Sequence, residues 1–184
     1  MLNPKQCVLY SGGAAGTEQF FGALAEDWGI EEVNFSFEGH QIERNRGVRV
    51  LTSEELALKD VSLTYVSKLM NREYTRAPLF RKVLQSICWQ IASGDHIVVI
   101  GSIQPDDTVK GGTGWGAEFA KICNKPLLVF DQNRNDWFCW EQKQWTLITN
   151  PVVAHAHFTA TGTRFLEDNG RDAIQGLFAR SFNR

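Results

Sequence analysis

Long apolar runs are missing from this chain of 184 residues. No uninterrupted apolar run exceeds four residues, as in Ile97-Val98-Val99-Ile100, whereas a membrane-spanning helix needs about 20. The first residues, Met1 to Lys5, also lack the apolar stretch of a signal peptide. The sequence therefore predicts neither a membrane span nor export, and we expect a cytoplasmic protein.

The chain also lacks metal-binding cysteine patterns and a large excess of either positive or negative charge. The four cysteines, Cys7, Cys88, Cys123 and Cys139, form no CxxC pair and no zinc-ligand spacing, so reduced thiols are the simplest interpretation. The 19 Lys and Arg residues nearly balance the 21 Asp and Glu residues, which leaves a net charge of −2. A near-neutral chain has no general attraction to nucleic acid or to anionic lipid, so any anion binding must be local.

The sequence alternates short β-branched runs with amphipathic stretches. It predicts strands or extended segments at Cys7–Tyr10, Val33–Phe37, Val48–Leu51, His96–Ile100, Leu127–Phe130 and Val152–Thr159, and helices at Thr17–Trp28, Thr52–Met70, Pro78–Gly94, Gly114–Asn124 and Glu167–Phe182. The Trp-rich stretch from Trp137 to Ile148 is typical of a β-hairpin. The pattern predicts an α/β fold, a Rossmann-like three-layer sandwich with a mostly parallel sheet, as one domain over residues 1–184.

Three glycine-bearing turns follow predicted strands and precede predicted helices: Ser11–Thr17, Gly111–Glu118 and Thr161–Arg164. The third turn is expected to interrupt the extended segment that begins at Val152. In a parallel sheet such turns lie at the carboxyl edge, where ligands bind. Glycine lets backbone N–H groups approach an oxyanion, and a helix N-terminus adds a positive dipole end. Tight turns also use glycine for packing, and that alternative stays open. The predicted ligand-binding residues at this edge are Ser11, Gly12, Gly13, Gly16, Thr17, His40, Gly111, Gly112, Thr113, Gly114, Trp115 and Arg164.

The central and C-terminal part of the pattern resembles a known superfamily. The segments His96–Gly101, Gly111–Glu118 and Lys125–Phe130 resemble the core of the SLOG superfamily. That group takes in DprA-like proteins, Lonely guy enzymes, YpsA-like proteins and molybdenum-cofactor carrier-like proteins, and the resemblance implies a Rossmann-like fold that binds nucleotides or similar ligands. The turn Ser11–Gly16 resembles the first loop of the YpsA-like and carrier-like branch.

The resemblance also implies a chemistry. The Lonely guy pattern Gly-Gly-x-Gly-Thr-x-x-Glu is matched at Gly111, Gly112, Gly114 and Glu118, with Trp115 in the threonine position. The same stretch is similar to nucleoside deoxyribosyltransferases, whose glutamate is a nucleophile. The resemblance thus implies Glu118 as the catalytic residue for cleavage or transfer at an N-glycosidic bond.

Three functions stay open at this point. One is an enzyme acting on a nucleoside phosphate, with Glu118 catalytic and Trp115 stacked on the base. Another is a non-catalytic module that binds or senses a nucleotide or cofactor, and the third is a structural or assembly protein whose glycine turns no longer bind a ligand. Glu118 is equally typical of a first-turn glutamate stabilised by the helix dipole, and Trp115 of a core aromatic. No metal site is predicted, although the pair Asp106-Asp107 leaves Mg²⁺ open, and a homodimer is also open.

Overall fold

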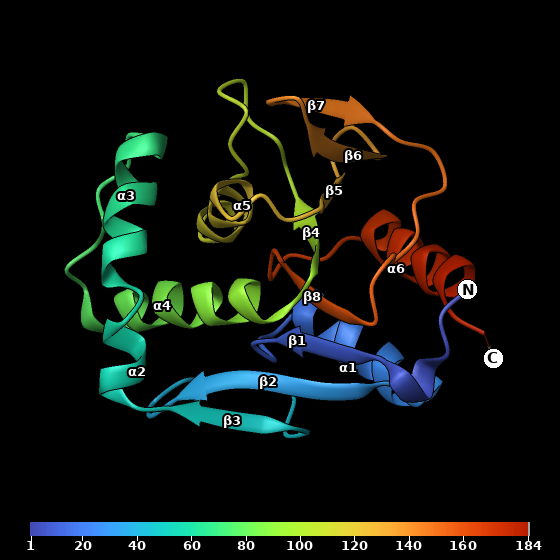
Figure 1. Cartoon of the computed structure of the whole chain (residues 1–184), viewed down its shortest axis with the longest axis horizontal. Helices are drawn as coiled ribbons and strands as arrows, with labels where there is room; N and C mark the ends of the chain where they lie inside the picture. The colour runs from blue at the N-terminus through green and yellow to red at the C-terminus, as the bar shows by residue number, and fades with distance from the viewer. Residues whose placement is uncertain (184) are drawn as a thin grey trace.

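The computed structural model describes residues 1–183, which form one eight-stranded sheet with helices on both faces (Figure 1). Its elements, in chain order, are η1 (Pro4–Gln6), β1 (Val8–Ser11), α1 (Thr17–Trp28), β2 (Glu31–Phe37), β3 (Val48–Leu51), α2 (Ser53–Ala57), α3 (Asp60–Met70), α4 (Pro78–Ser93), β4 (His96–Gly101), α5 (Thr113–Ile122), β5 (Leu127–Asp131), β6 (Asp136–Glu141), β7 (Gln144–Leu147), β8 (His157–Gly162) and α6 (Asp168–Ser181). The predicted α/β fold with a mostly parallel sheet is confirmed. No helix within these residues is long and apolar enough to cross a membrane.

The sheet has the strand order β3-β2-β1-β8-β4-β5-β6-β7. The strands from β3 to β5 in this order are parallel, while β6 pairs antiparallel with β5 and β7 antiparallel with β6. The late strand β8 lies in the middle, between β1 and β4, as Figure 1 shows. The strand-to-helix connections after β1, β4 and β8 therefore leave the same edge of three adjacent strands.

Alternation along β4 divides the core between the two faces of the sheet. Val98 and Ile100 pack into a cluster with residues of α1 and α6, while Ile97 and Val99 pack into a cluster with residues of α3, α4 and α5. Successive side chains of a strand point to opposite faces, and β4 is buried on both. This double burial explains why the strand reads as a continuous apolar run.

Two element predictions are wrong in detail. The single helix expected over Thr52–Met70 is broken into α2 and α3. The carbonyl of Glu55, which a continuous helix would pair with the N–H of Lys59, accepts instead from the indole N–H of Trp89 at 3.0 Å. The N–H of Lys59 bonds to the carbonyl of Leu56 three residues back.

The other correction concerns the third glycine turn. Thr161-Gly162 was expected to interrupt the extended segment, but both residues belong to β8. Thr161 and Gly162 pair with Val99 and Ile100 of β4, and this pairing extends the strand beyond Thr159, the last residue of β8 in register with β1. The turn that leaves the carboxyl edge is therefore Thr163 to Phe165.

Candidate functional site

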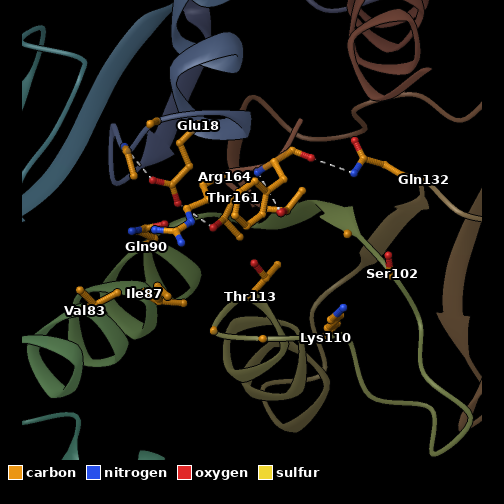
Figure 2. Close-up of a pocket in the computed structure, with 18 of the residues that line it drawn as sticks. Glu18, Val83, Ile87, Gln90, Ser102, Lys110, Thr113, Gln132, Thr161 and Arg164 are labelled. Atoms are coloured by element: carbon orange, nitrogen blue, oxygen red, sulfur yellow. Dashed lines mark hydrogen bonds between the residues drawn. The ribbon is translucent and has the colours of Figure 1, made fainter. Parts of the chain in front are cut away.

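A cavity of about 660 Å³ opens at the carboxyl edge of the sheet. Such a volume is typical of small-molecule sites, which run from about 300 to 1,000 Å³. The connections after β1, β4 and β8 line it, together with one face of α4 (Figure 2). Of the predicted ligand-binding residues, five lie along its wall: His40, Gly111, Gly112, Thr113 and Arg164.

The connection after β1 is organised around a buried carboxyl group, Glu18, which is not among the predicted site residues. Glu18 in the first turn of α1 lines the cavity and is only 6% exposed. Its carboxylate accepts from the N–H of Ala14 at 3.0 Å and from Oγ1 of Thr161 at 2.7 Å. The N–H of Gly12 is a third donor. The N–H groups expected to hold a phosphate are thus directed at the protein's own carboxylate.

Burial is the main influence on the pKa of Glu18. It raises the pKa of this carboxyl group, although the three hydrogen bonds oppose the shift. A sequence signal for Glu18 was available, because it shares the inward face of α1 with Phe21, Gly22 and Ala25, all of them buried. A charged residue on the apolar face of an amphipathic helix is unusual, and it indicates either a ligand-binding site or a buried hydrogen bond.

The other predicted residues of this turn connect segments of the protein and do not line the cavity. The hydroxyl of Ser11 donates to the carbonyl of Ala160 at 2.8 Å, and the hydroxyl of Thr17 donates to the carbonyl of Thr163 at 2.7 Å. A Cβ on Gly16 would collide with the backbone of Arg164. The alternative that a turn glycine serves packing therefore fits the position of Gly16.

One face of α4 forms an apolar wall that ends in an amide. Phe80, Val83, Ile87 and Gln90 follow one another at spacings of three and four residues along this helix and line the cavity. Gln90 is 2% exposed, and its Oε1 has no hydrogen-bond partner among the described residues. Figure 2 shows the Gln90 side chain beside Glu18, at the same end of the cavity. None of the predicted site residues lies on this helix.

The connection after β4 supplies the opposite, electropositive side. It carries Lys110, Gly111 and Gly112 to the cavity, and α5 then begins at Thr113 without a side-chain cap. The N–H groups of Gly114 and Trp115 already donate to the carbonyls of Gly111 and Gly112, at 3.2 and 3.0 Å. What this helix start offers a ligand is therefore mainly the positive end of its dipole. Lys110 and Arg164 are exposed, and neither has an ion-pair partner within residues 1–183.

Arg72 holds this connection in place. Its Nη2 donates to the side-chain oxygens of Gln104 and Thr108 at 2.6 and 2.7 Å. Its Nη1 lies 3.4 Å from the carbonyls of Val109 and Gly111. A Cβ on Gly114 would collide with the carbonyl of Val109, so this glycine lets α5 pack directly on the loop.

Glu118 and Trp115 are not among the residues that line the cavity. Glu118 lies five residues after Thr113, or about 1.4 helical turns, and so on another face of α5. Its carboxylate pairs with Lys121 at 3.1 Å, and the ammonium group of Lys121 lies 3.7 Å from the ring centre of Trp140. Trp115 is 4% exposed and packs in the core beside Tyr74. Trp115 thus occupies the core position considered as its alternative, whereas Glu118, the sixth residue of α5, lies neither in the cavity wall nor in the first turn of the helix.

His40 lies on the cavity wall after β2. Its ring stacks on Phe37 with centroids 4.5 Å apart, and its Nδ1 is 3.3 Å from the hydroxyl of Ser36. Burial lowers its pKa, so the imidazole is neutral at pH 7. Across residues 1–183, no group of three His, Cys, Asp or Glu side chains is arranged to hold a metal ion.

Comparison with known proteins identifies the fold. No protein-family model and no curated protein matches this chain. Among solved structures, the chain is similar to a "Putative molybdenum carrier protein" from Syntrophus aciditrophicus SB, with a TM-score of 0.56 and 14% identity. The likeness covers 96% of this chain and 94% of that one. At 14% identity, this likeness shows that the two proteins share an arrangement of helices and strands.

Proposed function

We propose that the protein binds a small molecule of the nucleotide or nucleoside-phosphate class in the cavity at the carboxyl edge. The observation that carries this proposal is the polarity of that cavity. The start of α5 offers a positive dipole end with the exposed Lys110 beside it, and the exposed Arg164 enters the cavity from the connection after β8 (Figure 2). Another side offers the apolar wall of α4.

The electropositive side suits a phosphate group. Backbone N–H groups at a helix start bind anions, and Lys and Arg add charge-assisted hydrogen bonds. A Cβ added to Gly111 would meet no atom within 4 Å, and one added to Gly112 would lie 3.6 Å from the ring of Phe80, so little side-chain bulk covers the start of α5. This arrangement replaces the first glycine turn, whose donors are directed at Glu18, as the expected phosphate site.

The apolar side suits a planar ring. Val83 and Ile87 line it, and Phe80 and Phe165 remain 44% and 70% exposed where they border the cavity. Exposed aromatic rings beside a cavity favour stacking on an aromatic ligand. We therefore assign the stacking role that was expected of Trp115 to Phe80 and Phe165.

Binding without catalysis is the form of this proposal that the site supports best. Glu118, the residue expected to act at an N-glycosidic bond, does not line the cavity. The name of the structural neighbour, a molybdenum carrier, agrees with a protein that holds a small molecule. The carboxyl groups that do line the cavity are Glu18 and Glu167, and an N-glycosidase activity would have to use one of these.

The test is calorimetric titration with AMP, GMP, CMP, UMP and inorganic phosphate. We expect at least one mononucleotide to bind, and the double variant Lys110→Ala/Arg164→Ala to lose about tenfold or more in affinity. The variant Lys5→Ala/Lys143→Ala, which removes the same charge at exposed positions outside the cavity, is the matched control. Chromatography of the same mixtures for free base separates an enzyme from a binder. Absence of binding by every mononucleotide would refute the proposal.

A further inference from the structure

The inner end of the cavity, defined by Glu18, Gln90 and Thr161, holds a buried hydrogen-bond acceptor that no donor among the described residues fills. All three side chains line the cavity and are 6%, 2% and 2% exposed. The hydroxyl hydrogen of Thr161 is directed at Glu18, so it is not free for a ligand. Figure 2 shows Glu18 and Gln90 side by side at this end, away from Lys110.

Counting lone pairs shows which acceptor positions are unfilled. An ionised carboxylate offers about four acceptor positions and an amide oxygen two. Protein donors reach Glu18 from Gly12, Ala14 and Thr161, which leaves about one position open. Oε1 of Gln90 has no partner at all among the described residues. A buried acceptor without a donor is costly, so this end of the cavity favours a ligand that brings donors.

Gly12 makes room for this arrangement. A Cβ at that position would lie 2.5 Å from Nε2 of Gln90 and 2.8 Å from Oε2 of Glu18. The missing side chain therefore lets a residue of α4 and a residue of α1 meet over the end of β1. This gives the glycine of the first turn a function at the site that differs from phosphate binding.

We propose that this end selects a heterocycle whose edge carries two adjacent donors, as guanine does with its N1–H and its 2-amino group. The inference rests on the proposed nucleotide binding. One donor reaches Oε1 of Gln90 and the other reaches the open position on Glu18, while the ring lies along Val83 and Ile87. Adenine presents an amino group beside an acceptor nitrogen, and hypoxanthine lacks the 2-amino group, so each leaves one buried acceptor unpaired.

The experiment compares GMP, IMP and AMP by calorimetry on three forms of the whole chain. We expect the wild type to bind GMP about tenfold or more tightly than IMP or AMP, because the unpaired acceptor penalises the other two ligands. In Gln90→Leu the preference for GMP over IMP should fall below about threefold. Gln90→Met, which is unbranched, replaces this variant if leucine prevents folding.

Gln85→Leu is the matched control. Gln85 is also buried on α4, but its amide donates to Asp60 at 2.8 Å, and it does not line the cavity. The Gln85→Leu variant should prefer GMP over IMP and AMP to the same extent as the wild type. Equal binding of GMP, IMP and AMP by the wild type, or a GMP preference that survives in the Gln90 variants, would overturn the inference and leave nucleotide binding intact. If none of the three ligands binds, the proposed function fails together with the inference.

Discussion

Two glutamates near helix starts illustrate how a residue acquires its role from its surroundings. Glu18 and Glu118 both follow glycine-rich turns after a strand, and only Glu118 matches a catalytic motif. The structure places Glu18 in the cavity and pairs Glu118 with Lys121. The difference arises because Glu18 is the second residue of its helix and Glu118 the sixth, so the two point to different sides.

Replacing Glu118 tests that difference directly. We expect Glu118→Gln to leave mononucleotide affinity within about twofold, because the side chain does not line the cavity. The loss of the ion pair with Lys121 should lower the free energy of unfolding by about 1 kcal/mol. Calorimetry and denaturant titration measure the two effects. A large loss of ligand affinity in this variant would place Glu118 back in the site.

His96 predicts how stability depends on pH. It is buried at the start of β4, its Nδ1 accepts from the N–H of Ala154 at 3.0 Å, and burial lowers its pKa from 6.5 to about 4. Between pH 6.5 and pH 4, His96 is protonated in the unfolded chain and neutral in the folded chain. The free energy of unfolding therefore decreases as the pH falls through this range. The group's contribution amounts to about 3 kcal/mol.

Comparison of variants isolates this effect from other titrating groups. We expect His96→Gln, which keeps a side-chain acceptor, to lose about 3 kcal/mol less than the wild type between pH 6.5 and pH 4 in urea titrations. His157→Gln, at an exposed histidine of the neighbouring strand β8, should follow the wild-type profile. Identical profiles for the wild type and His96→Gln would contradict the assignment.

At the scale of elements, the glycine turns differ in what they do. Gly16 has φ +87 and lies where a Cβ would collide with the backbone of Arg164, so it joins the connection after β1 to the connection after β8. Gly112 would place a Cβ 3.6 Å from Phe80, an ordinary contact. One glycine is required by packing between elements, and the other leaves the start of α5 uncovered.

Alanine substitutions should separate these two roles. Gly16→Ala combines left-handed backbone strain with a backbone collision, and we expect it to cost more than about 2 kcal/mol of unfolding free energy. Gly112→Ala should change stability by less than about 1 kcal/mol. Thermal or urea unfolding of both variants provides the measurement. Equal stability of the two would show that the turns after β1 and β8 can separate without cost.

At the scale of the whole molecule, the sheet was more predictable than the site. Buried parallel strands such as His96–Ile100 are local apolar runs, and their alternation with helices predicts a parallel sheet whose turns share one edge. The lining of the cavity depends on which face of a helix meets that edge, and no local pattern indicates that Gln90 of α4 reaches Gly12. The same limit explains Trp115, whose burial beside Tyr74 depends on a segment distant in sequence.

The central position of β8 predicts that the fold needs its C-terminal segment. A chain ending at residue 156 lacks β8 and α6, and with them Phe158, Ile174, Leu177 and Phe178 of the core. We expect this truncated chain to show no cooperative thermal transition and to bind a hydrophobic dye. Adding residues 157–184 as a separate peptide should restore cooperativity. A cooperative transition without the peptide would contradict the prediction.

The same strand order has a consequence for the chain as it is made. Synthesis delivers β1 to β3 first and β4 to β7 later, and only β8 joins the two half-sheets. Until then β1 and β4 each present an open edge, which is a template for pairing with other chains. A ribosome that stalls before residue 157 would therefore display two unpaired strand edges, and the nascent chain needs protection from aggregation until β8 emerges.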